Sequence, residues 1–202
     1  MIAHRWPTWA VVVAGLVLLA QSGAPTSPGA GLATTQRDRD SRLTARWSQV
    51  VAGQPAPDAG EPVARLAIPA LGVRWVVVEG VDAPRLADAP GHYPQTALPG
   101  QVGNFAVAAH RVPGLFGDLD RLAPGDLVLV EADGRTHTYT VTGTALVAPT
   151  AVSVLAPVPG APDATARQAT LTLTTCEPGK GTDRRLVVFA ELRADPRHGR
   201  NT

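Results

Sequence analysis

The chain has 202 residues, of which 45% are hydrophobic and 17% are charged, and its formal net charge is +1. This length and composition predict one folded domain around one sizeable core and argue against two. Because the charge is nearly neutral and no five like charges follow one another, no nucleic-acid partner is expected.

The N-terminus predicts an export signal. Arg5 precedes an apolar run from Trp9 to Ala20, and no further charge follows until Arg37. Twelve residues at about 1.5 Å each span about 18 Å, which is short of a hydrocarbon core of ~30 Å. Ser22-Gly23-Ala24 offers a cleavage site, while the long uncharged stretch also fits an uncleaved anchor. Residues 1–24 are therefore predicted to be a signal peptide or a signal anchor.

The next segment differs in composition from the rest of the chain. Residues 25–62 are rich in Ala, Gly, Pro, Ser and Thr, which predicts a mostly disordered stalk with one short helix around Leu43 to Val51. From Val63 onward the pattern changes to β-prone runs, so a folded domain is expected over 63–193. Residues 194–202 are predicted to be a polar tail.

The folded part reads as a series of short strands. Asp82 to Ala89 predicts one or two helical turns, Asp133-Gly134 is a hairpin turn, and residues 148–168 form a long loop with four prolines. About seven strands without a long amphipathic helix predict an all-β, closed or nearly closed barrel. The expected strands are Val63 to Pro69, Val73 to Glu79, Gly103 to His110, Asp126 to Glu131, Thr136 to Val141, Ala169 to Thr175 and Leu186 to Leu192.

Cys176 is the single cysteine, so the chain has no intrachain disulfide. A lone cysteine is more often a small buried hydrophobe, but an unused thiol is a liability in an oxidising compartment. Cys176 ends an alternating strand and precedes Glu177-Pro178-Gly179, a rim position that solvent can reach. It is a candidate nucleophile, and a cation or base nearby would favour the reactive thiolate.

Two residues are candidates to assist the thiol. His110 ends a predicted strand, although a histidine there is more often structural. His92 competes with it but lies between turn residues and is expected to be less firmly held. Arg185 opens the last strand nine residues after Cys176, so it could lie beside the thiol and donate to a carbonyl oxygen, although an arginine there is more often a solvated surface charge. Arg184 would point to the opposite face.

No metal site and no cofactor are predicted. Zinc requires several Cys or His residues at short spacing, and one Cys with scattered His does not supply them. Calcium requires a cluster of carboxylates, and the long loop 148–168 contains only Asp163. The sequence also lacks a glycine-rich loop that would hold a phosphate.

Three motifs together resemble the sortase family of cysteine transpeptidases. Asn104-Phe-Ala-Val-Ala-Ala-His-Arg111 is similar to its His strand, Thr172-Leu-Thr-Thr-Cys176 to its TLxTC strand, and Arg185-Leu-Val-Val188 to its final strand. The resemblance extends over about 63–192. Ala109 is a departure, because glycine usually precedes the histidine, but a methyl group changes packing and no chemistry.

The resemblance implies an eight-stranded sortase-type barrel with short helices and 3-10 turns. Cys176 would attack the Thr carbonyl of an LPxTG- or LAxTG-like sorting motif, and the amine of a peptidoglycan precursor, lipid II, would resolve the thioacyl enzyme. His110 would move the protons, and Arg185 would hold the oxyanion or position the substrate. Tyr93 and Thr175 would bind substrate, with Tyr93 helping to select the residue after Leu. The implied location is the extracellular face of the cell membrane, or outside the cell if the leader is cleaved.

One other sortase class and two other functions are alternatives that the sequence also allows. Gly91 to Gly100 is similar to the corresponding segment of class E sortases, the housekeeping class of high-GC Gram-positive bacteria, and the lid motif of class C is absent. Class F is the alternative, but its His motif usually continues with Val-Asp, whereas here Arg111-Val-Pro113 follows. An exported cysteine hydrolase of the same fold and a non-catalytic binding module of the cell envelope are the other two hypotheses.

Overall fold

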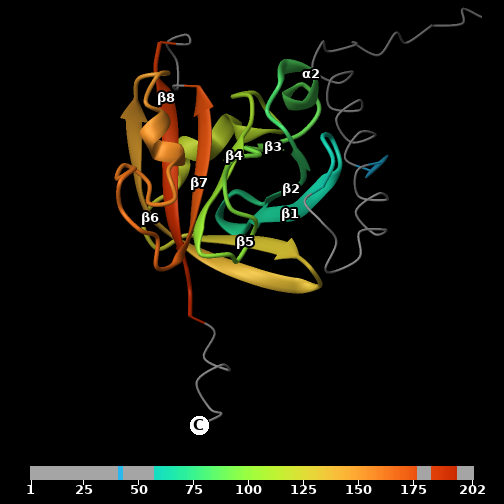
Figure 1. Ribbon diagram of the computed structural model, residues 1–202. Coiled ribbons are helices and arrows are strands. Elements are labelled where there is room, and N and C mark those ends of the chain that lie inside the picture. Colours follow the sequence, from blue (N-terminus) through green and yellow to red (C-terminus); the bar gives the residue numbers. More distant parts are fainter. Residues whose placement is uncertain (1–40, 43–56, 177–182, 195–202) are drawn as a thin grey trace, which may run out of the picture.

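In a computed structural model the described residues are 41–42, 57–176 and 183–194 (Figure 1). The predictions for the leader, for nearly all of the stalk and for residues 195–202 lie outside them. Within the described residues, no helix has both the length and the apolar composition needed to cross a membrane.

Eight strands of the described chain close into a barrel, in the order β1-β2-β3-β4-β7-β8-β6-β5, and β5 pairs with β1. This confirms the predicted barrel and adds β3, a two-residue strand where the sequence predicted only a turn. The strands are β1 (Pro62–Ile68), β2 (Val73–Glu79), β3 (Gly91–His92), β4 (Gly103–Ala108), β5 (Leu127–Ala132), β6 (Arg135–Val147), β7 (Ala169–Cys176) and β8 (Arg185–Leu192). The helical segments are η1 (Pro69–Leu71), α2 (Ala83–Leu86), η2 (Phe116–Arg121) and η3 (Val152–Leu155).

The barrel interior is filled by side chains that alternate along the strands. Phe105 and Val107 of β4 lie in the core with Leu171 and Leu173 of β7, and Tyr139 of β6 is the largest fully buried side chain. Because neighbouring residues of a strand point to opposite faces, the residues that alternate with Leu171 and Leu173 in β7 lie on the outer face. We call this the threonine face of β7, and it consists of Thr170, Thr172, Thr174 and Cys176.

A 3-10 helix, η2, lies in the segment between β4 and β5. Leu119 and Phe116 of η2 are fully buried, and the Phe116 ring packs edge-on against the Trp75 ring at 5.3 Å between centroids. The indole Nε1–H of Trp75 donates to the Gly114 carbonyl oxygen at 2.7 Å. This packing fixes the path of the chain directly after the predicted catalytic histidine.

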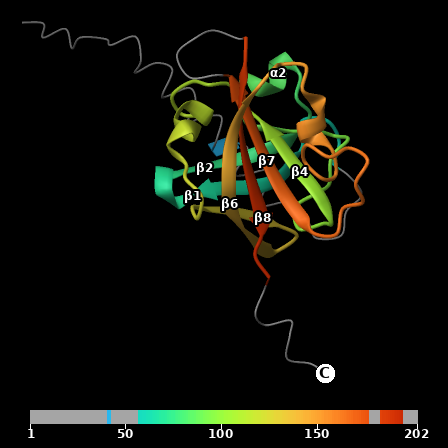
Figure 2. The ribbon, with the colours of Figure 1, turned by 90° about the vertical axis from the view of Figure 1, so that its left-hand side faces the viewer.

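The long connection between β6 and β7, residues 148–168, lies beside the outer face of β4 and β7 (Figure 2). Buried Asn104 holds it there, because its side-chain amide donates to the carbonyl oxygens of Val154 at 3.0 Å and Ala156 at 3.2 Å. The amide oxygen of Asn104 in turn accepts from the Thr172 hydroxyl at 2.8 Å. One polar side chain therefore joins the loop to the threonine face.

We expect Asn104→Ala to lower the free energy of unfolding by about 1–3 kcal/mol, because it leaves buried hydrogen-bonding groups without partners. Urea denaturation of the full chain measures the change. Thr142→Ala is the control, since its exposed hydroxyl also donates to a carbonyl, that of Phe189, but solvent can replace the bond. A smaller loss in Asn104→Ala than in Thr142→Ala would contradict the assignment of Asn104 as the anchor.

Candidate active site

The candidate nucleophile and the candidate arginine lie opposite each other. Cys176 is the last residue of β7 and pairs with Arg185, the first residue of β8, in the antiparallel register. Directly opposed residues carry their side chains on the same face, with Cβ atoms about 4.5–5.5 Å apart. Both residues are half-buried. Figure 1 shows β7 ending and β8 beginning at the same end of the barrel.

His110 lies two residues beyond the end of β4. Strands β4 and β7 are parallel, with Ala108 opposite Thr174, and the Ala109 N–H still donates to the Thr174 carbonyl at 3.2 Å. Continuing this register by two residues brings His110 level with Cys176. The histidine side chain is exposed, and its backbone carbonyl accepts from the N–H at the start of η2 at 3.1 Å. The three candidate residues therefore come from three adjacent segments at one end of the barrel.

The two neighbouring arginines differ in their surroundings. Arg184 precedes β8, is exposed, and donates through Nη2 to the Leu146 carbonyl oxygen on β6 at 3.0 Å. Arg185 is half-buried, and its Nη1 donates to the Arg184 carbonyl oxygen at 3.3 Å. Of the two, Arg185 shares a register position with Cys176.

Arg111, the residue after His110, ties this segment to η2. Its Nη2 donates to Asp120 Oδ1 at 2.7 Å, and this hydrogen bond holds the pKa of Asp120 below its ordinary value. Its Nη1 is buried without a hydrogen-bond partner in the part of the chain that the structure describes. The ion pair limits the freedom of the backbone that carries His110, which favours a fixed position for the imidazole.

The two predicted substrate-binding residues lie on opposite faces of the sheet. The Tyr93 hydroxyl is 3.2 Å from Thr174 Oγ1, so the tyrosine lies over the threonine face, which also carries Cys176. Thr175 points the other way, is 3% exposed, and its hydroxyl donates to the Ala109 carbonyl oxygen at 2.9 Å. Tyr93 is therefore placed where a substrate could meet it, whereas the Thr175 side chain is occupied beneath the His110 segment.

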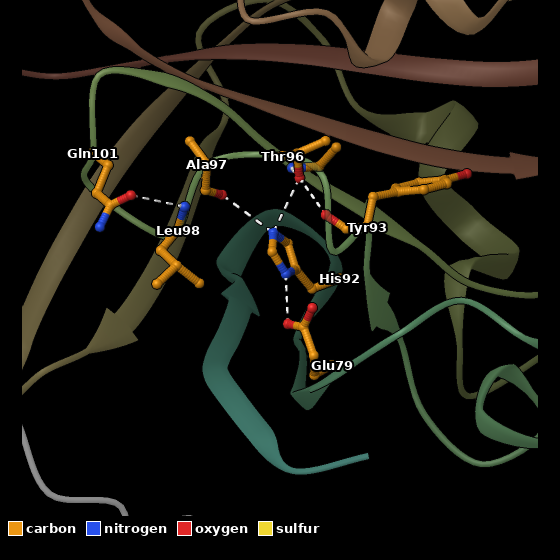
Figure 3. A network of polar contacts seen from close by, with 8 residues as sticks. Glu79, His92, Tyr93, Thr96, Ala97, Leu98 and Gln101 are labelled. Carbon is orange, nitrogen blue, oxygen red and sulfur yellow. Dashed lines mark hydrogen bonds and ion pairs between the residues drawn. The ribbon is translucent and has the colours of Figure 1, made fainter. Parts of the chain in front are cut away.

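The sequence predicted that His92 is less firmly held than His110, and this prediction is wrong. Its side chain is 2% exposed, lies 5.2 Å from the Phe105 ring, and has Nδ1 at 2.7 Å from Glu79 Oε2 (Figure 3). A buried imidazole paired inside the barrel cannot reach a substrate at Cys176. The sequence signal for the pair is a glutamate that directly ends an apolar strand, since such a charge needs a partner if the strand is buried.

The cavity beside α2 lies away from the candidate catalytic residues. A cavity of about 540 Å³ lies between β2 and α2, and none of the candidate residues lines it. In residues 57–176 and 183–194 no group of three His, Cys, Asp or Glu side chains is arranged to hold a metal ion. The residues that line the cavity are Ala59, Gly60, Val78, Asp82, Pro84, Arg85, Asp88 and Ala89.

Comparison with known proteins identifies the family to which the chain belongs. The family model of the sortase domain matches residues 66–193. Sortase SrtE1 of Streptomyces coelicolor is 32% identical over 167 residues, which cover 75% of this chain and 46% of that protein. The chain spans about half the length of the curated relatives it matches.

Solved structures show the same fold. Sortase E from Streptomyces avermitilis is 38% identical with a TM-score of 0.60, and the match covers 72% of this chain and 97% of that one. SrtA sortase from Actinomyces oris is 35% identical with a TM-score of 0.64, covering 75% and 91%. The chain therefore belongs to the sortase family, and its likeness to sortase E proteins from Streptomyces supports class E.

Proposed function

We propose that this chain is a cysteine transpeptidase that cleaves an LPxTG- or LAxTG-like sorting motif between Thr and Gly and joins the new carbonyl end to an amine. The observation that carries the proposal is the register that sets Cys176 opposite Arg185 at the barrel end where β4 delivers His110. A thiol, an imidazole and a guanidinium are the groups that acyl transfer through sulfur requires.

The first half of the reaction forms a thioester. The Cys176 thiolate attacks the Thr carbonyl carbon, and the electron pair of the C=O bond moves onto oxygen. Arg185 donates hydrogen bonds to this oxyanion. As the intermediate collapses, the C–N bond breaks and protonated His110 gives its proton to the leaving glycine amine. The peptide that follows Thr leaves, and the rest stays bound to sulfur.

The second half reverses these roles. The incoming amine attacks the thioester carbon, neutral His110 accepts a proton from the amine, and the Cys176 thiolate leaves. The products are a new amide and the free enzyme, so nothing is oxidised or reduced. With water in place of the amine the same site is a hydrolase, which is why the acceptor must be tested directly.

Two further residues support the site in this proposal. Tyr93 contacts the sorting peptide, since it lies over the face that carries Cys176, and the resemblance to class E sortases implies that the contact is to the residue after Leu. Thr175 acts indirectly, since its hydroxyl is bonded to the Ala109 carbonyl and so helps to position His110. The partners in this proposal are proteins with a sorting signal and the amine of lipid II. The place of action is the extracellular face of the membrane, with residues 1–24 as anchor or cleaved signal.

The full chain, purified in detergent, should form a covalent thioacyl adduct with Leu-Ala-x-Thr-Gly or Leu-Pro-x-Thr-Gly peptides. Mass spectrometry detects the adduct at Cys176, and added amine should convert the product from the free acid to the amide. Product that stays the free acid at every amine concentration would identify a hydrolase. No adduct with any peptide, together with slow alkylation of Cys176 by iodoacetamide, would identify a binding module.

A further inference from the structure

A buried pair of polar side chains, Glu79 and His92, lies inside the barrel next to Tyr93. Strands β2 and β3 are parallel with Glu79 opposite His92, and both side chains are buried, at 7% and 2% exposure. Glycine at position 91 allows this approach, because a Cβ there would overlap the Gly80 carbonyl oxygen. The absence of a side chain at position 91 therefore lets the two segments approach closely enough for the carboxylate and the imidazole to meet.

The hydrogen bonds around His92 fix where its protons lie. Nε2 is 3.2 Å from the Ala97 carbonyl oxygen, which can only accept, so this nitrogen carries a hydrogen. The Thr96 hydroxyl oxygen, 3.0 Å away, also accepts from Nε2–H and uses its own hydrogen for the Tyr93 carbonyl at 2.8 Å. One more proton lies in the 2.7 Å contact between Nδ1 and Glu79. In this arrangement both ring nitrogens of His92 and the Thr96 hydroxyl have hydrogen-bond partners.

The Nε2 atom of His92 contacts two residues in the connection between β3 and β4, Thr96 and Ala97, as Figure 3 shows. Thr96 also accepts from the N–H of Ala106 on β4 at 3.2 Å. Tyr93 follows His92 directly and points to the opposite face, so a shift of the imidazole moves the tyrosine. The turn that presents Tyr93 is therefore held from inside the barrel.

The far end of the same connection is fixed separately. The N–H of Gly100 donates to the buried Tyr139 hydroxyl at 2.8 Å, and burial raises the pKa of that phenol. Gly100 has a φ of +76°, and a Cβ there would overlap the His137 ring. Because this anchor is independent of Glu79 and His92, changes in the pair should affect mainly the end that carries Tyr93.

We propose that Glu79 and His92 are a positioning pair that holds Tyr93 over the threonine face for binding of the sorting peptide. This inference rests on the proposed transpeptidase function. A buried ion pair costs desolvation and is often no more stabilising than apolar side chains of similar size. A role in stability alone therefore gives little reason for the pair, whereas a role in holding Thr96 and Ala97 requires its polar atoms.

Steady-state cleavage of a Leu-Ala-x-Thr-Gly peptide by the full chain in detergent tests the proposal. Glu79→Leu with His92→Phe replaces the pair by apolar groups that can still pack against the Phe105 ring. We expect a thermal midpoint near that of the unsubstituted chain and a KM raised on the order of tenfold to a hundredfold by misplacement of the binding side chain. The kcat should fall less, and the rate of Cys176 alkylation should not change.

Two variants serve as controls. Glu79→Gln should keep a KM close to that of the unsubstituted chain, because its amide can donate to Nδ1 while Nε2 keeps its hydrogen. Glu131→Leu removes a carboxylate from β5 that pairs with Arg65 at 3.5 Å on another part of the barrel, and it should leave KM unchanged.

The outcomes separate this inference from the function on which it rests. Failure of the unsubstituted chain to cleave any peptide overturns both. Cleavage by the unsubstituted chain with an unchanged KM in the folded double variant overturns the positioning role alone. If the double variant does not fold, Thr96→Val removes the hydroxyl between His92 and the Tyr93 carbonyl without removing a charge. A raised KM in that variant supports the proposal, and an unchanged KM overturns it.

Discussion

Cys176→Ala is expected to abolish cleavage and thioacyl formation completely, because the chain has no other cysteine to carry the acyl group. Cys176→Ser should also be nearly inactive, since a hydroxyl is a far weaker acid than a thiol and forms much less of the nucleophilic anion. Mass spectrometry of the adduct and chromatography of the cleaved peptide measure both effects.

The fold should survive the loss of the thiol. Cys176 is half-buried at a strand end, and the β7–β8 ladder is made by backbone groups that alanine retains. We therefore expect a thermal midpoint close to that of the unsubstituted chain. Thr170→Ala, at the other end of the threonine face, is the matched control and should keep its activity, although its hydroxyl donates to the Gly103 carbonyl at 3.1 Å. Residual cleavage by Cys176→Ala would remove this residue from the mechanism.

The parts of the site that could be predicted from sequence depend on local rules. The position of Cys176 at a strand end followed from alternation and from the Pro-Gly turn after it. Adjacency of Arg185 followed from the short β7–β8 connection, because antiparallel strands joined by a short loop usually pair. The barrel followed from short strands without long helices, and its eighth strand was expected from the family resemblance.

The parts that were missed depend on pairing between distant segments. Strand β3 has two residues, too few to show any period, and it exists because Gly91 and His92 pair with β2 and β4. The burial of His92 follows from that pairing, so its neighbours in sequence gave no sign of it. The motif around His110 contains Asn104 but does not reveal its role, because its partners in the loop lie about fifty residues away.

Substitutions of the two arginines should have opposite consequences. Removing one donor to an oxyanion typically lowers the rate on the order of a hundredfold to a thousandfold. We expect an effect of this size in acylation by Arg185→Ala, and a strong but smaller effect in Arg185→Lys. Lysine keeps the charge but loses the planar fork that can bond two oxygen atoms at once. Arg184→Ala should be nearly silent, because it loses only one exposed hydrogen bond to the Leu146 carbonyl.

Single-turnover acylation of the full chain, followed by mass spectrometry, separates this step from resolution by the amine. Thermal denaturation of each variant shows whether a slow rate reflects loss of fold. The antiparallel register sets Arg185 and not Arg184 opposite Cys176, so the order of the two effects tests the register as well as the chemistry. An essential Arg184 with a dispensable Arg185 would mean that the final strand is displaced by one residue in the active enzyme.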